Sequence, residues 1–271
     1  MHAPSSVGIA ALVTSVTMLA CAPAHAQAQQ KYPTKPIRLV VAFTPGSATD
    51  ITSRLIAAKI SDVWGQPIVI ENRAGAGGTL AATVVAKATP DGYTLLATSG
   101  AFAIAAALRT DLPYDPLKNF AGVSEIGYGT TMIVASPSLG VKSVAELAAL
   151  SQTKPGFLLF GTAGAGTATH MSAERFRYAA GVEARHVAFK GHPEFVVEII
   201  AGRIHFGSSS VTVSLPFVRD GKLLALVVVT PQRPDVPTAR EVVPGWAETD
   251  RSRGWRPEGR PPRSAARSAR K

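Results

Sequence analysis

Two strand-to-helix loops in the sequence have the residue types that bind small anions. In the first, "VAFTPGSATDITSRL", a run of apolar β-formers stops at Pro45-Gly46 and helical spacing begins at once. A helix that starts directly after a strand presents unpaired backbone N–H groups and the positive end of its dipole, and both attract an anion. Gly46 lets a ligand approach the backbone closely because it has no Cβ. Ser47 and Asp50 have the spacing of a capping box, an interpretation that we favour for Asp50 over ligand contact.

The second loop, "GTAGAGTATHM", follows an apolar stretch at residues 157–160. Its glycines make the loop flexible, and Thr167 or Thr169 is placed to cap the next helix. It has neither the Lys-Ser/Thr pair of a P-loop nor the spacing of a dinucleotide fingerprint. Ligands bind at the carboxyl ends of strands in open α/β sheets, so two such loops facing across a cleft are expected to grip one small anion. A third glycine-rich turn, "ENRAGAGGTLAATVV", is interpreted as a tight connection.

The Ser and His residues support a catalytic role less well than the two loops support anion binding. The chain has no G-x-S-x-G elbow in a strand-turn-helix setting and no H-E-x-x-H metal motif. His170 falls within a predicted helix, where we interpret it as a capping or packing residue rather than a catalytic base. A carboxylate-processing hydrolase therefore stays an alternative to a non-catalytic binding protein. We expect no catalytic residue, no metal and no cofactor.

Strand and helix patterns alternate along the chain, and these elements must position the two loops. Apolar runs rich in β-branched residues predict strands, and amphipathic or Ala-rich runs predict helices. The predicted strands are residues 37–43, 67–71, 93–98, 132–135, 157–160, 184–189, 204–206 and 223–229. The predicted helices are residues 49–60, 79–88, a short stretch after Gly100, 143–151, 167–179 and 194–201. Repeated β-α-β units predict an α/β fold with parallel sheets and helices on both faces.

Composition limits the other functional classes. With 271 residues, of which 46% are hydrophobic, the chain is long enough for one large domain or two modest ones. Residues 247–271 hold eight Lys or Arg and three acidic residues, so this stretch contributes half of the formal net charge of +10. The rest is only mildly basic and has no recognisable nucleic-acid-binding module, so we expect no nucleic-acid partner. The Arg- and Pro-rich stretch itself is expected to be disordered.

The first 26 residues have the features of an export signal. Residues 7–20 are mostly apolar, and Ala24-His25-Ala26 fits the small-x-small cleavage rule. The alternative, a membrane anchor, needs about 20 apolar residues, and this run is shorter. Cys21 is the only cysteine and lies inside the segment, so the mature chain is expected to have neither disulfides nor thiolate chemistry. These features predict a cleaved signal peptide, residues 1–26, and a periplasmic location.

Several segments, taken in order, resemble one protein family. They are "YPTKPIRLVVAFTPGSATDITSRL", "GQPIVIENRAGAGGT", "ATPDGYTLL", "LPYDPLKNF", "GTAGAGTATH" and "HVAFKG". Similar motifs occur in the same order in the extracytoplasmic solute-binding proteins of tripartite tricarboxylate transporters, the Bug or TctC-type receptors of bacteria. The resemblance runs from about residue 32 to about residue 245 and so covers nearly all of the chain between the signal and the basic tail.

The resemblance implies a two-lobed Venus-flytrap fold of the type II periplasmic binding protein kind, with parallel or mixed sheets flanked by helices. Lobe one would comprise residues 27–125, lobe two residues 126–222, and residues 223–246 would return to lobe one. It also implies a monomeric receptor that captures a small organic carboxylate and delivers it to a tripartite-type membrane transporter or a sensor. The residues carried over for ligand binding are Pro45, Gly46, Ser47, Asp50, Thr98, Ser99, Gly164, Gly166, Thr167, Thr169, His170 and Ser209.

The chain departs from the family pattern in four places, one of which is "RIHFGSSSVT", where His205, Ser209 and Ser210 stand in place of the residues that the family often has. Ser47 replaces the second glycine of a usual Pro-Gly-Gly, which adds a hydroxyl and is expected to narrow the pocket. His192-Pro193-Glu194 stands where the family commonly has a small residue. The family continues past "DVPT" with helices that complete lobe one, whereas this chain becomes Arg- and Pro-rich after Trp246, as a reading-frame shift would produce. The C-terminal part of lobe one is therefore expected to be missing, and a truncated, partly or wholly non-functional receptor is a further alternative.

Overall fold

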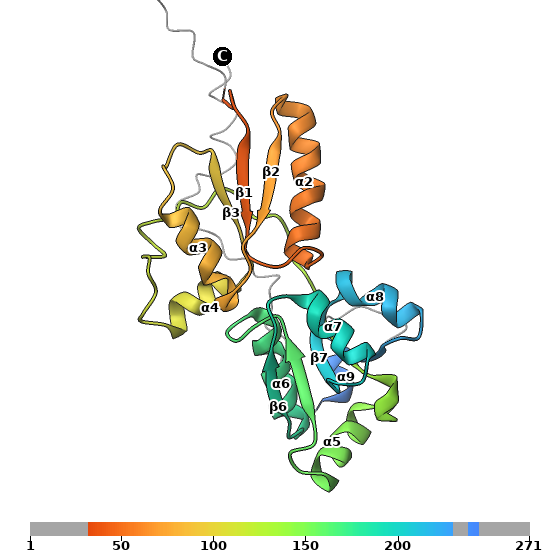
Figure 1. Cartoon of the computed structure of the whole chain (residues 1–271). Helices are drawn as coiled ribbons and strands as arrows, with labels where there is room; N and C mark the ends of the chain where they lie inside the picture. Colours follow the sequence, from red (N-terminus) through yellow and green to blue (C-terminus); the bar gives the residue numbers. More distant parts are fainter. Residues whose placement is uncertain (1–31, 230–237, 244–271) are drawn as a thin grey trace, which may run out of the picture.

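The computed structural model describes residues 32–229 and 238–243, which form two lobes that lie one above the other (Figure 1). The predicted signal peptide, residues 1–26, and the predicted disordered tail, residues 247–271, lie outside the described residues. In the described part of the chain, no helix is both long and apolar enough to cross a bilayer.

The first lobe is built on a parallel sheet with the strand order β2-β1-β3. Its strands are β1 (Ile37–Val41), β2 (Ile68–Asn72) and β3 (Thr94–Ala97). Its helices are α2 (Ala48–Trp64), η2 (Ala76–Gly78), α3 (Thr79–Ala86) and α4 (Ala101–Leu108). Helix α2 lies beside β2, whereas α3 and α4 lie on the other side, toward β3 (Figure 1). The carboxyl ends of the three strands therefore meet at one edge, and each continues directly into a loop that opens a helix.

Strand β1 is the middle strand of this sheet and has buried apolar residues on both of its faces. Ile37, Val40 and Val41 are fully buried, as expected for a parallel strand covered on both sides. Helix α2 begins at its N-cap Ser47 and ends at Gly65, which adopts the left-handed conformation (φ 65°) that closes many helices. The start of this helix after β1 agrees with the sequence prediction.

The second lobe contains a five-stranded mixed sheet with the order β6-β5-β7-β4-β8. Its strands are β4 (Thr131–Ala135), β5 (Leu159–Thr162), β6 (Arg185–Ala188), β7 (Phe206–Ser210) and β8 (Leu224–Val228). Its helices are η3 (Pro137–Leu139), α5 (Val144–Thr153), α6 (Ala168–Ala180), α7 (His192–Ile200), α8 (Val211–Arg219) and α9 (Ala239–Val242). Strands β5, β6 and β7 run parallel, and β4 is antiparallel to both β7 and β8.

Two apolar clusters hold helices against both faces of this sheet. One cluster packs Leu147 of α5 and Phe176 of α6 against Phe160 and Phe206. The other cluster packs Phe195 and the rest of the apolar stripe of α7, together with α8, against the opposite face. The predicted α/β class, with helices on both faces of its sheets, is confirmed.

The structure differs from the sequence prediction at three elements of the second lobe. Residues 223–246 were expected to return to lobe one, but β8 pairs with β4 inside the second sheet. A buried run such as "LALVV" fits either sheet, so its sequence does not choose between them. Strand β7 covers Phe206–Ser210 rather than residues 204–206, because its serines pair with β4. Helix α8 was not predicted, since its β-branched residues and Pro216 favour other conformations.

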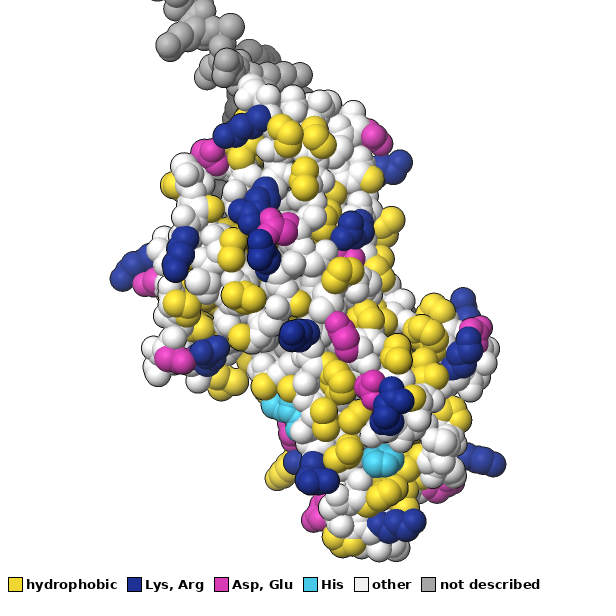
Figure 2. Space-filling view, viewed as in Figure 1, with side chains coloured by type: hydrophobic (Ala, Val, Ile, Leu, Met, Phe, Trp, Pro, Cys, Tyr) yellow, Lys and Arg dark blue, Asp and Glu magenta, His cyan; other side chains and the backbone are white. Residues whose placement is uncertain are grey.

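Residues 121–128, which span the expected boundary between the lobes at residue 125, have no regular secondary structure and are mostly exposed. They precede β4, the first strand of the second sheet. In the space-filling view, cationic and anionic side chains are interspersed over both lobes on the visible face, without one dominant basic patch (Figure 2). This distribution fits the mildly basic body inferred from the sequence.

The close packing of β7 on β5 depends on glycine, which gives a test of the core. A Cβ on Gly207 would lie 2.5 Å from the carbonyl oxygen of Gly161, and close to Phe195 as well. We expect Gly207→Ala to lower the free energy of unfolding by about 1–3 kcal/mol through overpacking. Urea denaturation measures this, with Gly129→Ala as the control, since no atom lies within 4 Å of that site. Equal stability of the two variants would contradict this account of the core.

Candidate functional site

A cavity of about 440 Å³ lies between the two lobes. The first lobe contributes the loop before α3 and the last turns of α4, and the second lobe contributes the loops that follow β5 and β6. The lining residues are Gly75, Ala76, Gly77, Ile104, Ala105, Leu108, Arg109, Ala163, Gly164, Ala165, Gly166, Ala188, Phe189 and Lys190. Its volume falls in the range of small-molecule sites, which also favour clefts between lobes.

Glycine-rich loops of the two lobes meet in the wall of this cavity. A Cβ on Gly77 would lie 2.8 Å from the carbonyl oxygen of Ala165, and one on Gly164 would lie 3.7 Å from Cα of Gly77. Gly77 has φ 64° and Gly164 has φ 125°, both in the region that favours glycine. The turn at Gly75–Gly77, interpreted from sequence as a tight connection, is therefore part of the cavity lining. Its signal was the same strand-glycine-helix pattern that drew attention to the other two loops.

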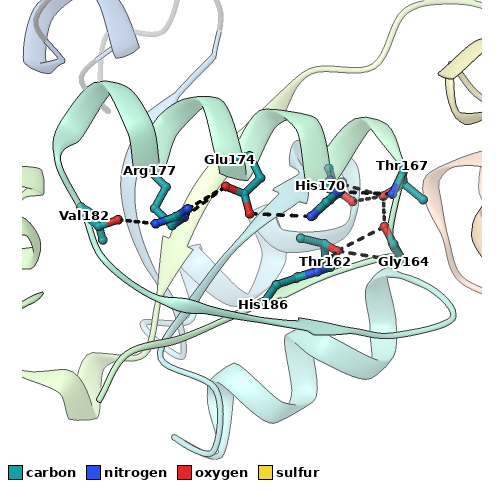
Figure 3. Close-up of polar contacts among 10 residues, drawn as sticks. Thr162, Gly164, Thr167, His170, Glu174, Arg177, Val182 and His186 are labelled. Atoms are coloured by element: carbon teal, nitrogen blue, oxygen red, sulfur yellow. Dashed lines mark hydrogen bonds and ion pairs between the residues drawn. The ribbon is translucent and has the colours of Figure 1, made fainter. Parts of the chain in front are cut away.

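The loop after β5 is held by hydrogen bonds from its own side chains (Figure 3). Thr167 caps α6: its Oγ1 accepts from the N–H of His170 at 3.3 Å and donates to the carbonyl of Gly164 at 2.7 Å. Oγ1 of Thr169 accepts from the N–H of Ala163 at 3.1 Å. The N–H of Gly166 donates to Nδ1 of His170 at 3.3 Å. These side chains shape the loop and consume some of the amides that the sequence had suggested for a ligand.

Two stacked imidazole rings, those of His170 and His186, pack against the loop that follows β5. The rings of His170 and His186 lie with centroids 4.2 Å apart, and Nε2 of His186 is 2.7 Å from Oγ1 of Thr162 (Figure 3). Burial, with a smaller contribution from the neighbouring His170, lowers the pKa of His186 to about 4. Burial also lowers the pKa of His170, although Glu174 opposes this. Because Nδ1 of His170 accepts from the N–H of Gly166, this nitrogen carries no proton in this arrangement.

The loop after β1 is organised around the carboxylate of Asp50, which is only 2% exposed. This carboxylate accepts from the N–H of Gly46 at 2.9 Å, from Nδ2 of Asn72 at 2.8 Å and from Nε of Arg54 at 3.0 Å. Burial by itself raises the pKa of Asp50, but these hydrogen bonds outweigh it and hold the pKa below its usual value. Oγ of the buried Ser47 accepts from the N–H of Asp50 at 3.3 Å. Ser47 therefore caps α2 as predicted, whereas the carboxylate of Asp50 accepts from the N–H of Gly46, one residue before the cap, rather than from the N–H of Ser47 as in a capping box.

The same first loop touches the start of α7 across the gap between the lobes. Oγ1 of Thr44 donates to Oε2 of Glu194 at 3.2 Å, and Gly46 faces Pro193. A Cβ on Gly191 would lie 1.8 Å from Oγ1 of Thr44, so only glycine fits there in this arrangement. The unusual His192-Pro193-Glu194 segment thus forms part of an interlobe contact.

The remaining residues expected at the site lie outside the cavity lining. Oγ of Ser99 accepts from the N–H of Ala101, the first residue of α4, at 3.2 Å, and Thr98 follows the end of β3. Ser209 is fully buried on β7 and accepts from Oγ of Ser214 at 2.6 Å. Of the twelve residues carried over from the resemblance, Gly164 and Gly166 line the cavity. In the described part of the chain, no His, Cys, Asp or Glu side chains cluster as a metal site requires.

A family comparison identifies the kind of protein that this cleft belongs to. Residues 52–263 match the model of the tripartite tricarboxylate transporter family receptor, TctC. The chain belongs to this receptor family. Protein BugT of Bordetella pertussis is 33% identical over 217 residues, which cover 78% of this receptor and 67% of BugT.

Solved structures of similar proteins carry the same fold. The Rhodopseudomonas palustris protein Rpa4515, solved with adipate, superposes with a TM-score of 0.75 and 36% identity, over 79% of this receptor and 74% of that chain. MatC (Rpa3494) of the same organism, solved with bound malate, gives a TM-score of 0.72 and 34% identity, over 78% and 74% of the two chains. The two-lobed periplasmic binding protein fold expected from the sequence is confirmed.

Acidification is expected to lower the free energy of unfolding of the receptor, because His186 is protonated more readily in the unfolded chain than in the native one. Its native pKa of about 4 lies below the ordinary value of 6.5, so between these values the unfolded chain binds more protons than the native one. The stabilisation is complete above pH 6.5 and is lost as the pH falls toward 4. Urea denaturation at several pH values, compared with His186→Gln, measures it. A stability difference between the two proteins that stays constant over this range would contradict the assignment.

The contact between Gly191 and Thr44 predicts a steric effect on lobe closure. Gly191 has φ −167°, which any residue adopts, so Gly191→Ala acts only through its methyl group. We expect this variant to hold the lobes apart and to increase the radius of gyration in small-angle X-ray scattering.

Gly100→Ala is the matched control, since no atom lies within 4 Å of its Cβ position. Adding Thr44→Ala to Gly191→Ala removes the hydroxyl that clashes and is expected to restore part of the compact form. If the scattering curves of Gly191→Ala and the unmodified receptor are the same, the contact between residue 191 and Thr44 does not limit lobe closure.

Proposed function

We propose that this receptor captures a small organic acid by its carboxylate in the cleft between the lobes. The observation that carries the proposal is the lining itself: glycine-rich backbone from both lobes and two cationic residues, Arg109 and Lys190, with no acidic residue among the described residues that line it. Backbone N–H groups and cations bind carboxylates through short, charge-assisted hydrogen bonds. The adipate and malate in the titles of the similar structures are both small carboxylic acids, which supports the same ligand class here.

The geometry narrows the proposed donors. The amides of Gly46 and Gly166 already donate to Asp50 and His170, so we assign them to loop architecture. The donors proposed for the carboxylate are the backbone N–H groups of Gly77 and Ala165, because both residues line the cavity and their loops approach each other there. Gly164 is proposed to keep the wall open to the ligand.

The other carried-over residues take a supporting role in this proposal. They hold the loops or the ends of the elements that carry them. They are Pro45, Gly46, Ser47, Asp50, Thr98, Ser99, Gly166, Thr167, Thr169, His170 and Ser209.

The hydrolase alternative has little support in this geometry. Thr162 and His186 form a hydroxyl–imidazole pair at 2.7 Å, as a nucleophile and its base would. Thr162 is fully buried, however, so its hydroxyl has no access to a substrate. The family is also one of receptors rather than enzymes.

We further propose that the receptor works in the periplasm as a monomer and hands its ligand to membrane subunits of a tripartite tricarboxylate transporter or to a sensor. The family description and the periplasmic binding protein fold support this role. Closure of the lobes on a ligand would supply the signal that a membrane partner reads. Cleavage of residues 1–26 belongs to the same proposal.

A thermal-shift screen of the purified protein against mono-, di- and tricarboxylates tests the ligand class. A bound carboxylate at a hundred times its dissociation constant is expected to stabilise the fold by about 2.7 kcal/mol and to raise Tm, whereas the corresponding amides should not. Gly77→Leu should abolish the shift, because its side chain would meet the carbonyl of Ala165.

Gly122→Leu is the control for this variant, because no atom lies within 4 Å of that position. A screen in which no carboxylate changes Tm would overturn the proposed function. A shift that survives in Gly77→Leu would move the carboxylate away from the loop of Gly77.

A further inference from the structure

A row of polar contacts runs along helix α6 and ends at the cavity (Figure 3). Nη1 of Arg177 donates to the carbonyl of Val182 at 3.1 Å, and its Nε and Nη2 donate to Oε2 of Glu174 at 3.2 and 3.0 Å. Oε1 of Glu174 lies 3.8 Å from Nε2 of His170. Nδ1 of His170 accepts from the N–H of Gly166, which lines the cavity. The row therefore links the far end of α6 to a backbone amide of the cavity wall.

The ring of His170 is held in place from several sides. It stacks on His186 of β6, with an angle of 26° between the two planes, and its side chain is only 19% exposed. The carboxylate of Glu174 lies beside Nε2 and is itself held by Arg177. These contacts favour the tautomer with its proton on Nε2, which leaves Nδ1 as the acceptor for Gly166.

The hydrogen bond to Gly166 depends on the charge of this ring. A neutral imidazole has one acceptor nitrogen, whereas a protonated one has only donors. Protonation of Nδ1 places an N–H against the N–H of Gly166, so the bond between them is lost. The titratable groups that the structure places against the ring are Glu174 on α6 and His186 on β6. Burial lowers the pKa of His170, and the negative charge of Glu174 opposes this.

We propose that His170 and Glu174 are positioning residues for the cavity loop, and that their hold on Gly166 is released by protonation. With a neutral ring, the amide of Gly166 is occupied inside the protein. With a protonated ring, the amide becomes an additional donor in the cavity wall, beside a cation. Glu174 sets the pH of the change because its charge stabilises the imidazolium. The inference rests on the proposed function only for what the released amide would bind.

Nuclear magnetic resonance of the full chain without ligand tests this directly. The ring nitrogens of His170 give its state of protonation, and hydrogen exchange gives the protection of the Gly166 amide relative to its intrinsic rate at each pH. At neutral pH we expect an unprotonated Nδ1 and a protected amide. As the pH falls, the protection should drop roughly tenfold, with the same midpoint as the titration of His170.

Variants at His170 separate positioning from titration. His170→Asn keeps an acceptor oxygen near the place of Nδ1 but cannot be protonated in this range. It should retain the protection of Gly166 at neutral pH and lose its dependence on pH. His170→Ala removes the acceptor and should lower the protection roughly tenfold at neutral pH.

Variants at acidic residues assign the role of Glu174. Glu174→Gln keeps the shape of the side chain and removes its charge, so both midpoints should move to lower pH together. Glu198→Gln is the matched control, because Glu198 also pairs with an arginine, Arg203, but lies on α7. It should move neither midpoint.

The outcomes are independent of any ligand. Protection of Gly166 that stays constant while His170 titrates would overturn the inference, as would a ring that remains neutral down to the pH at which the fold is lost. Equal protection in His170→Asn and His170→Ala would remove His170 as the positioning residue, and unchanged midpoints in Glu174→Gln would remove Glu174. Each of these results leaves carboxylate capture standing, whereas a carboxylate screen without binding overturns the proposed function alone.

Discussion

The close approach of two backbones across the cleft is the constraint on which the rest of this structure depends. Gly77 of the first lobe meets the carbonyl of Ala165 of the second, and Gly191 meets the side chain of Thr44. A Cβ at either glycine would collide with the opposite lobe. Because the contact at Gly77 brings backbone to backbone, the cavity beside it can expose peptide groups of both lobes to one small ligand.

Most polar side chains near the cleft serve the architecture rather than the ligand. The carboxylate of Asp50 is saturated by Gly46, Asn72 and Arg54, and the hydroxyl of Thr167 bonds within its own loop. A buried polar group left without partners is costly, so loops built this way are rigid. As a result, the groups that line the cavity are backbone, apolar side chains and the two cations Arg109 and Lys190.

The departures from the family pattern have a physical role in this arrangement. The hydroxyl of Ser47 points into the first turn of α2 as a cap and is fully buried, so it does not narrow the cavity as its extra atoms had suggested. Pro193 and Glu194 open α7 and make the contact with Gly46 and Thr44. They therefore tie the lobes together at a place away from the cavity lining.

The sequence alone determined the class of fold and the local form of the loops. Alternating apolar runs and helical periods predicted most strands and helices, and the cap at Ser47 and the glycines at 164 and 166 followed from local rules that need no distant partner.

Three features of the molecule were decided only by the tertiary structure. The first is the place of strand β8, which pairs with β4 in the second sheet. Its apolar run could pair in either sheet, so the sequence does not specify the partner. Gly75–Gly77 entered the cavity because its role depends on what the opposite lobe places against it. The amides of Gly46 and Gly166 were taken by Asp50 and His170, since whether a free N–H finds an internal acceptor depends on side-chain positions that spacing does not specify.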